Sequence, residues 1–200
     1  MKWITYYTIG TPYEHECDRL RSSMRRLGLR LSAYGIKDKG TWQKNTQYKA
    51  EFIRDQIADR KHGTVWIDSD AIIWKRPELF DHPPIDNPDF MAAWTATNSL
   101  TGINAACLYW GGTDKAREIA DRWVEKVREN PRARFADQTP LDQVIKEVIK
   151  EGGAKTIKLP PSYSYIFDKT DKSCRNIKFE DIVIEQFQVS RWFKNLRAKD

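Results

Sequence analysis

The chain has 200 residues, which suits one domain, and 40% of them are hydrophobic, which is too many for a disordered chain. No apolar run approaches the roughly 20 residues of a membrane span, and residues 1–7 alternate like a strand instead of forming a signal peptide. The net charge is +6, and residues 1–60 hold 12 Lys and Arg against 7 Asp and Glu. That excess suits a polyanionic partner or a phosphorylated substrate, although a solvated basic face is the ordinary alternative.

Cysteine and histidine usage limits the possible sites. Cys17, Cys107 and Cys174 are odd in number and far apart, which excludes a disulfide framework and a Cys-x-x-Cys zinc site. The three histidines are too scattered to build a metal site, so any metal must be held mainly by oxygen. We expect a protein of the reducing cytoplasm, without membrane insertion.

Strand and helix patterns alternate along the chain. In chain order, the predicted elements are a strand over residues 3–9, a helix over 13–27, a strand over 29–34, a polar loop over 36–44, a helix over 46–60, strands over 64–67, 90–94 and 105–110, helices over 114–129 and 139–151, and strands over 156–159 and 182–185. Thr139 and Pro140 are predicted to start the last helix, as capping residue and first helical residue. This order predicts a single α/β domain over residues 1–200, with a mixed central sheet flanked by helices.

The strongest motif lies where the apolar strand 64–67 ends, at Asp68, Ser69 and Asp70. In extended backbone, residues two apart share a face, so Asp68 and Asp70 can converge on one hard cation, Mg²⁺ or Mn²⁺. Ligands of open α/β sheets collect at the carboxyl ends of strands, which favours a site. The alternative is an ordinary surface or helix-capping pair of aspartates.

An apolar strand followed by Asp-x-Asp is also typical of haloacid-dehalogenase phosphatases, in which the first Asp is a nucleophile. That fold normally opens with this strand, whereas here a strand, a helix, a second strand and a second helix come first. It also needs a later acidic pair that follows a strand. The candidate pair here, Glu180 and Asp181, instead precedes the predicted strand 182–185. The phosphatase interpretation is therefore the weaker one.

Five segments in order resemble the GT-A nucleotide-diphospho-sugar transferases, particularly the bacterial galactosyltransferase and glycogenin group. The segments are ITYYTIGTPY (4–13), NTQYKAEFIRDQI (45–57), WIDSDAII (66–73), INAACLYWGGTDKAREIADRW (103–123) and ADQTPLDQVI (136–145). The resemblance implies a metal-dependent transferase that moves a sugar from a nucleotide diphosphate, a UDP-sugar, to an acceptor hydroxyl with retention. The metal would neutralise charge on the departing diphosphate.

The resemblance also implies roles for individual residues. Asn104 and Asp137 would bind the donor sugar hydroxyls, and Gln138 would lie under the anomeric carbon, so that Asp137 and Gln138 form the catalytic pair. The other implied donor-binding residues are Thr8, Ile9, Gly10, Tyr13, Lys49, Asp68, Ser69 and Asp70. The ordinary alternatives are a strand-edge turn for Asn104 and a helix N-terminal charge for Asp137.

One departure concerns the metal. The group usually supplies a histidine near its C-terminus as a third ligand, and the corresponding stretch here, IEQFQVSRWFK (184–194), contains none. Gln186 or Gln188 could take that place, and Arg191 or Lys194 could reach the diphosphate. Because a side-chain amide is a weaker ligand than an imidazole, the metal would be held more loosely or by the nucleotide itself. A binding module that has lost catalysis is therefore the alternative function.

Acceptor contacts are predicted from exposed aromatic and basic residues. Trp42 falls in the predicted loop 36–44, a place from which it could close over donor or acceptor, and its alternative is a packed loop aromatic. The outer face of helix 13–27 is rich in arginine, including Arg21 and Arg25. These charges would suit DNA phosphates as well as a saccharide acceptor.

Overall fold

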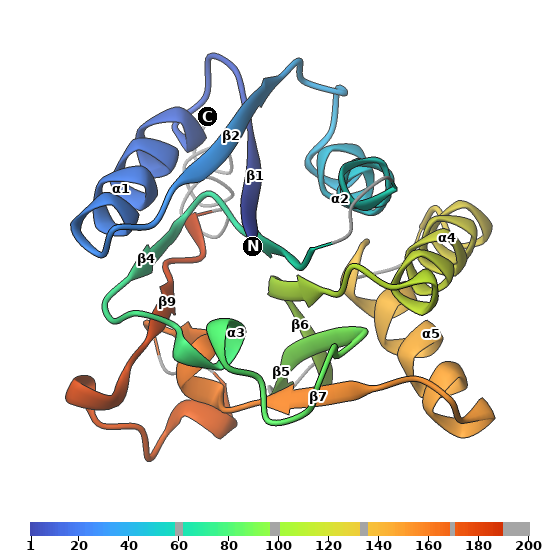
Figure 1. The fold of residues 1–200 in the computed structure, drawn as a ribbon. Helices are drawn as coiled ribbons and strands as arrows, with labels where there is room; N and C mark the ends of the chain where they lie inside the picture. The colour runs from blue at the N-terminus through green and yellow to red at the C-terminus, as the bar shows by residue number, and fades with distance from the viewer. Residues whose placement is uncertain (59–61, 97–100, 133–135, 169–170, 190–200) are drawn as a thin grey trace.

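A mixed six-stranded sheet forms the centre of the molecule (Figure 1). The computed structural model describes all residues except 59–61, 97–100, 133–135, 169–170 and 190–200. The strand order is β2-β1-β3-β6-β5-β7, and β6 runs antiparallel to its neighbours β3 and β5. The bounds are β1 Lys2–Thr8, β2 Leu31–Ile36, β3 Thr64–Ile67, β5 Phe90–Ala96, β6 Thr101–Trp110 and β7 Thr156–Leu159.

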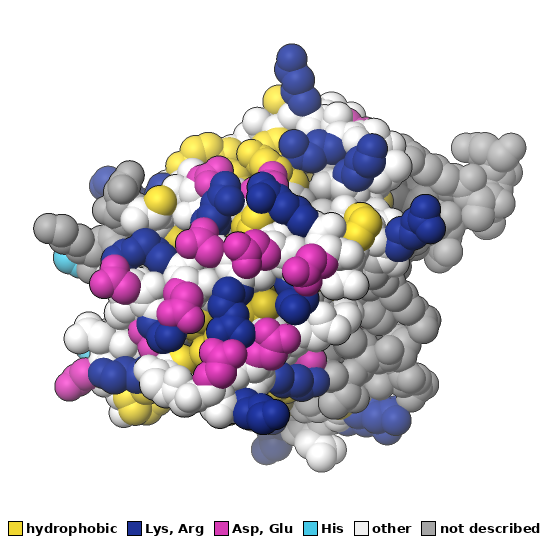
Figure 2. Space-filling view, turned by 90° about the vertical axis from the view of Figure 1, so that its right-hand side faces the viewer, with side chains coloured by type: hydrophobic (Ala, Val, Ile, Leu, Met, Phe, Trp, Pro, Cys, Tyr) yellow, Lys and Arg dark blue, Asp and Glu magenta, His cyan; other side chains and the backbone are white. Residues whose placement is uncertain are grey.

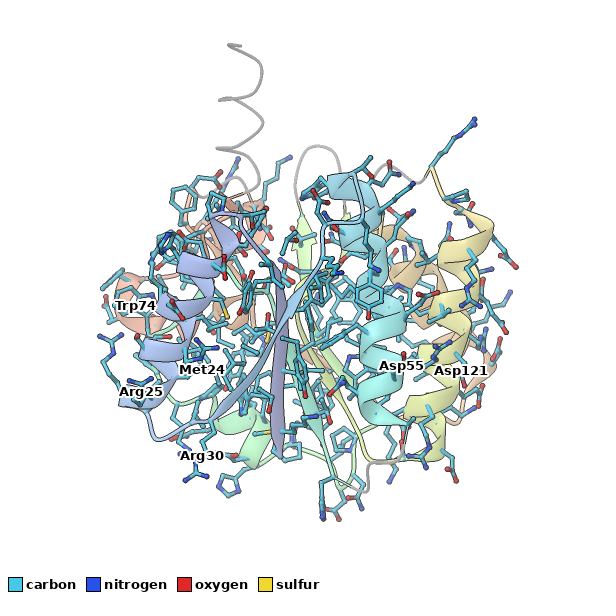
Figure 3. All side chains as sticks on the ribbon, turned by 90° about the horizontal axis from the view of Figure 1, so that it is seen from above. Met24, Arg25, Arg30, Asp55, Trp74 and Asp121 are labelled. Carbon is cyan, nitrogen blue, oxygen red and sulfur yellow. The ribbon has the colours of Figure 1, made fainter. Side chains whose placement is uncertain are left out.

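Helices and a second sheet cover the two faces of the central sheet. The helices are α1 Tyr13–Arg26, α2 Trp42–Ile57, the single turn α3 Glu78–Asp81, α4 Asp114–Glu129 and α5 Gln138–Glu151. The second sheet has the order β4-β9-β8, formed by Ala71–Ile73, Ile184–Gln186 and Tyr165–Ile166. Short 3-10 turns follow at Pro161–Tyr163, Lys172–Cys174 and Phe179–Asp181. From above, α1 lies on one side of the sheet, and α2 and α4, which carry the labelled Asp55 and Asp121, lie on the other (Figure 3).

Strand β3 and the first part of β1 are apolar on both faces because each face is buried there. Ile4 and Trp66 pack with α2, α4 and α5 in one cluster, whereas Trp3, Val65 and Ile67 pack with α1 and β4 in the other. Adjacent residues of one strand therefore pack into the hydrophobic clusters on opposite faces of the sheet. This explains why β3 appears in the sequence as a continuous apolar run ending abruptly at Asp68.

The outer surface formed by α2, α4 and α5 mixes both signs of charge (Figure 2). Arg122 of α4 bridges to Glu147 and Glu151 of α5 at 3.0 and 2.7 Å, and Arg128 of α4 bridges to Glu51 of α2 at 2.8 Å. This face therefore lacks the single-sign field that a polyanion would need. No described helix combines the length and apolar character required to cross a bilayer.

The predicted elements are largely confirmed, and α4, β3 and β7 have their predicted bounds. The prediction was wrong for the start of α2, which begins at Trp42 because Thr41 caps it by accepting a bond from the Lys44 amide at 3.1 Å. Trp42 therefore lies in a first helical turn and not in a loop.

Further boundaries differ from prediction, including the start of β6, which lies at Thr101 and not at residue 105. Helix α5 begins at Gln138 with Asp137 in the capping position, so Thr139 and Pro140 lie inside the first turn, where the missing Pro amide costs no helical bond. Strand β2 lies two residues later than predicted, and β9 ends at Gln186. Strands β4 and β8 were not predicted, because two or three residues carry no periodic signal.

Candidate functional site

The carboxyl ends of β1 and β3 point to the same edge of the sheet, because the two strands are parallel neighbours. Strand β6 passes antiparallel to β3, and the Asp68 amide donates to the Ala106 carbonyl at 2.8 Å. The Asp68 turn thus lies beside the segment that follows Asn104. Three of the segments singled out in the sequence meet at this edge of the sheet.

A buried lysine from α2 joins these segments. Lys49 Nζ lies 2.6 Å from Asp137 Oδ2 and 2.9 Å from Asp68 Oδ1, and it donates to the Ala105 carbonyl at 3.2 Å. Burial lowers the pKa of Lys49, but the Asp137 and Asp68 carboxylates outweigh burial and raise that pKa above its ordinary value. Lys49 is therefore a cation that holds two carboxylates in place.

Asp68 is held from two directions. Its Oδ1 accepts bonds from Lys49 and from the indole Nε1 of Trp66 at 2.9 Å, while 29% of its side chain stays exposed. Burial of the carboxyl raises its pKa to about 6, Lys49 opposes that shift, and Asp70 adds to it. Oδ2 accepts no bond from any described residue, so this oxygen is available to a ligand.

Asp70 faces the second sheet. Its Oδ2 accepts from the Val189 amide at 2.9 Å, and its carbonyl accepts from the Phe187 amide at 3.2 Å. Burial raises the pKa of Asp70, and the bond from Val189 partly offsets this. The chain after β9 is thereby fixed against the Asp-x-Asp turn. Ser69 between the two aspartates is buried.

The predicted substitutes for the missing histidine lie in this segment. Gln186 is fully buried directly opposite Ala71, and neither polar atom of its amide has a hydrogen-bond partner among the described residues. An unsatisfied buried amide is costly, which is typical of a group that awaits a ligand. Gln188 is half-buried with a left-handed φ of 54°.

The oxygen donors at this edge fit a hard divalent cation. Within the described ranges, no group of three His, Cys, Asp or Glu side chains gathers around one point. Two carboxylates and one amide oxygen still suit Mg²⁺ or Mn²⁺, because such ions commonly keep water and substrate phosphates as further ligands. The buried amide of Gln186, which lies opposite Ala71 and has no partner among the described residues, is the candidate amide ligand.

The residues expected at the donor sugar lie around Lys49. The buried Asn104 accepts a bond from the Ala106 amide at 3.0 Å through Oδ1, which leaves Nδ2 without a described partner. Asp137 makes no side-chain cap for α5 and instead pairs with Lys49. Gln138 is half-buried and accepts from the Ala105 amide at 3.5 Å, the outer limit of a hydrogen bond.

The predicted nucleotide end follows β1. Thr8 is buried, and its carbonyl accepts from the Thr11 hydroxyl at 2.7 Å. Ile9 is exposed, Gly10 has a φ of 73° that favours glycine, and Tyr13 begins α1. These residues lie at the same edge of the sheet as Asp68, because β1 and β3 are parallel.

The predicted acceptor residues lie apart from the Lys49 cluster. Trp42 is exposed in the first turn of α2, and Arg21 pairs with Asp18 on α1 at 2.6 Å. Arg191 and Lys194 lie outside the described residues. The sequence interpretation missed Trp66, whose indole donates to Asp68. The available signal was the spacing, because residues two apart on a strand share a face.

The comparisons with known proteins concern the fold. No protein-family model matches the sequence, and no curated protein matches it. The structure is similar to a glycosyltransferase involved in the glycosylation of the major capsid of PBCV-1, with a TM-score of 0.66, 13% identity and 100% of both chains covered. It is also similar to GlyE of Streptococcus pneumoniae TIGR4, with a TM-score of 0.64 and 16% identity.

A further similar structure is the bifunctional glycosyltransferase WbbM, with a TM-score of 0.59 and 11% identity. The chain is covered to 93% by GlyE and 94% by WbbM, yet it spans only 54% and 45% of their lengths. The chain therefore has the fold of solved glycosyltransferases. This confirms the predicted α/β fold class and the likeness of fold to glycosyltransferases.

Proposed function

We propose that this chain is a metal-dependent glycosyltransferase that moves a sugar from a UDP-sugar to an acceptor hydroxyl, with retention at the anomeric carbon. The observation that carries the proposal is the set of three contacts made by Lys49 to Asp68, Asp137 and the Ala105 carbonyl. These contacts bring the Asp-x-Asp turn, the Asn104 strand and the start of α5 to one edge of the sheet.

Asp68 and Asp70 are the proposed metal ligands, and Gln186 is the proposed third ligand, with Gln188 as the alternative. Bound there, Mn²⁺ or Mg²⁺ would neutralise the negative charge that develops on the departing diphosphate. The chain contributes the positions of these oxygens: Lys49 and Trp66 fix Asp68, and the Val189 amide fixes Asp70.

The neighbouring side chains are proposed to bind the donor sugar. The Asn104 amide would donate to a sugar hydroxyl, and Asp137, held by Lys49, would accept from another. Gln138 would face the anomeric carbon, where its amide oxygen could stabilise positive charge as the glycosidic bond breaks. Thr8, Ile9, Gly10 and Tyr13 are proposed to bind the base, and Arg191 or Lys194 the diphosphate.

The acceptor is proposed to be a saccharide or DNA, with Trp42, Arg21 and Arg25 as candidate contacts. We propose the reducing cytoplasm as the compartment, because all three cysteines are buried and unbridged. Reducing conditions would leave such thiols unchanged.

Hydrolysis of UDP-glucose and UDP-galactose tests the proposal. We expect these donors to release UDP, and not UMP, in the presence of Mn²⁺. We expect EDTA to stop that release. Metal-dependent binding of UDP without turnover of either donor, alone or with saccharide acceptors, would favour the binding module. Release that continues at full rate in EDTA would contradict the metal-dependent transferase.

A further inference from the structure

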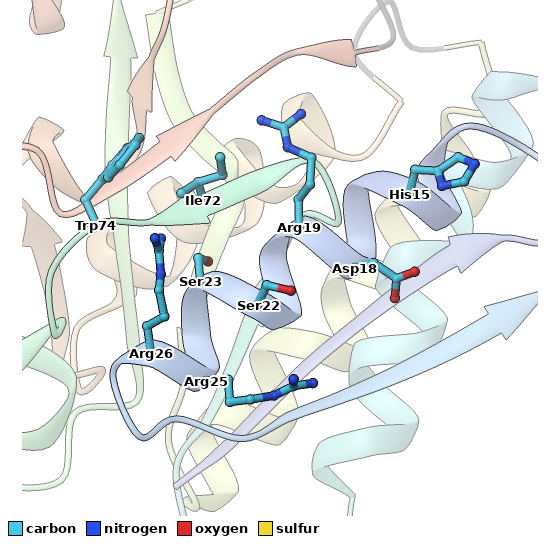
Figure 4. A pocket seen from close by; sticks show the side chains of 9 residues that line it. All are labelled: His15, Asp18, Arg19, Ser22, Ser23, Arg25, Arg26, Ile72 and Trp74. Carbon is cyan, nitrogen blue, oxygen red and sulfur yellow. The ribbon is translucent and has the colours of Figure 1, made fainter.

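A groove of about 790 Å³ runs between α1 and β4 (Figure 4). Its walls include Arg19, Arg25 and Arg26 from α1, and Ile72 and Trp74 from β4 and the residue that follows it. At a rise of about 1.5 Å per residue, the lining stretch of α1 from its first turn to Arg26 is about 17 Å long. The groove therefore suits an elongated ligand.

The outer end of the groove carries the exposed ring of Trp74, which contacts the exposed ring of Phe179. Trp74 is 40% exposed and Phe179 is 69% exposed, and their ring centroids are 5.6 Å apart. The Trp74 indole donates to Glu185 Oε2 at 2.8 Å, which fixes the ring before any ligand arrives. A fixed exposed indole presents a flat apolar surface, suited to the carbon-bound hydrogens of a sugar ring.

The cations on α1 differ in their availability. Arg19 pairs with Glu16 and Arg21 pairs with Asp18, each at 2.6 Å. Arg25 and Arg26, by contrast, are exposed and form no ion pair within the part of the chain that the structure describes. Figure 4 shows the Arg26 side chain rising toward the β4 side of the groove, near Trp74.

The inner end of the groove adjoins the candidate site. The Arg19 guanidinium lies over the Phe187 ring, 4.6 Å from its centroid, and the Phe187 amide donates to the Asp70 carbonyl at 3.2 Å. A chain lying in the groove would thus have one end beside the proposed metal ligands.

We propose that this groove binds the acceptor as an extended anionic saccharide, with a sugar ring on Trp74 and carboxylate, sulfate or phosphate groups on Arg25 and Arg26. This inference rests on the proposed glycosyl transfer. Two unpaired guanidinium groups complement a ligand with few, spaced charges. A nucleic acid carries a phosphate at every nucleotide and binds through many cations at once, so it fits this groove less well.

Binding of defined oligosaccharides to the full chain tests the inference. The probes are hexagalacturonate, a sulfated hexasaccharide, a phosphate-bearing hexasaccharide, neutral maltohexaose, and a single-stranded oligothymidylate of the same charge, each followed by calorimetry at fixed ionic strength. We expect at least one anionic saccharide to bind more tightly than maltohexaose and than the oligothymidylate. Trp74→Ala and Arg26→Ser should each weaken that binding by about tenfold, the usual effect of losing one charge-assisted or stacking contact.

Arg30→Ser is the matched control, because Arg30 is exposed, forms no ion pair with described residues and does not line the groove. The affinity of this variant for the anionic saccharide should stay within about twofold of that of the parent chain. Trp74→Phe retains a ring and should lose less affinity than Trp74→Ala, which separates ring loss from a folding defect.

The inference is overturned if no anionic saccharide exceeds maltohexaose, if the oligothymidylate binds most tightly, or if the groove variants bind like the Arg30 variant. Release of UDP from UDP-sugars, measured on the same samples, distinguishes failure of the groove proposal from failure of the transferase proposal. Metal-dependent release without anionic saccharide binding would refute the groove alone. Absence of release from every donor would refute the transferase.

Discussion

The Nζ atom of Lys49 lies 2.6 Å from Oδ2 of Asp137, a contact that joins α2 to the capping position of α5. Both side chains are buried, and the same ammonium also contacts Asp68. A buried charge is tolerable only when it is paired, so these three groups depend on one another. The pairing has a structural consequence as well as a functional one.

Lys49→Met should destabilise the fold. It leaves Asp137 buried and Asp68 partly buried without their cation. Removing one partner of a buried pair costs about 3–5 kcal/mol. Urea unfolding followed by circular dichroism measures this cost. The double variant Lys49→Met with Asp137→Asn should recover part of it, because the amide carries no charge. A single variant as stable as the parent chain would show that the pair is not coupled to folding.

Asp68→Asn and Asp70→Asn should each remove metal-dependent turnover while the chain stays folded. Both residues lie at a strand end, and an asparagine oxygen can still accept the bonds from Trp66 or Val189. The loss should amount to several kcal/mol of transition-state stabilisation. Turnover of UDP-sugars across a Mn²⁺ titration measures it, with Asp121→Asn, an exposed carboxylate on α4, as the control. Parent-like rates for either asparagine variant would exclude that residue as a ligand.

The fold was predictable where patterns were unambiguous. The 16-residue α4 and the apolar β3 have their predicted bounds, because an amphipathic stripe and an uninterrupted apolar run are unambiguous. The three-residue β4 was not predictable, since its strand identity comes from pairing with Ile184–Gln186 over a hundred residues away. Short strands acquire their conformation from partners that the local sequence does not contain.

The candidate site was predictable only in part. Resemblance placed Lys49 near the donor, but its bonds to Asp68 and Asp137 depend on how α2 packs against β3 and α5. The same holds for Gln186, because the isolation of its buried amide arises from the second sheet and not from its neighbours in sequence. Spacing identifies groups on one strand, whereas contacts between distant segments require the folded chain.

Arg122→Ala should weaken the packing of α4 against α5. Arg122 bonds to Glu151 and Glu147, and the bond from Arg122 lowers the pKa of Glu151 below its ordinary value of 4.5. A carboxylate with a lowered pKa stabilises the fold at neutral pH, and this contribution is lost as the pH falls through the lowered value. The variant's deficit in Tm should therefore be present at pH 7 and shrink below about pH 4.

High salt provides a second check on the same pairs. All three side chains are partly exposed, so the deficit should also shrink in 1 M NaCl, where the Debye length is about 3 Å. Arg54→Ala is the control, since the ion pair of Arg54 is with the adjacent Asp55 of its own helix. A deficit that is independent of both pH and salt would indicate lost apolar packing of the Arg122 stem.

Gln138→Ala should lower kcat with little change in KM. Gln138 opens α5 beside Asp137, and its bond to the Ala105 amide is long at 3.5 Å, so the ground state gains little from it. If its amide oxygen faces the anomeric carbon, the interaction strengthens only as positive charge develops there, and such an interaction affects turnover more than binding. Steady-state kinetics with a UDP-sugar measure both constants.

Gln143→Ala, an exposed position on the same helix, is the control and should match the parent chain. A raised KM with unchanged kcat would instead make Gln138 a residue of donor binding.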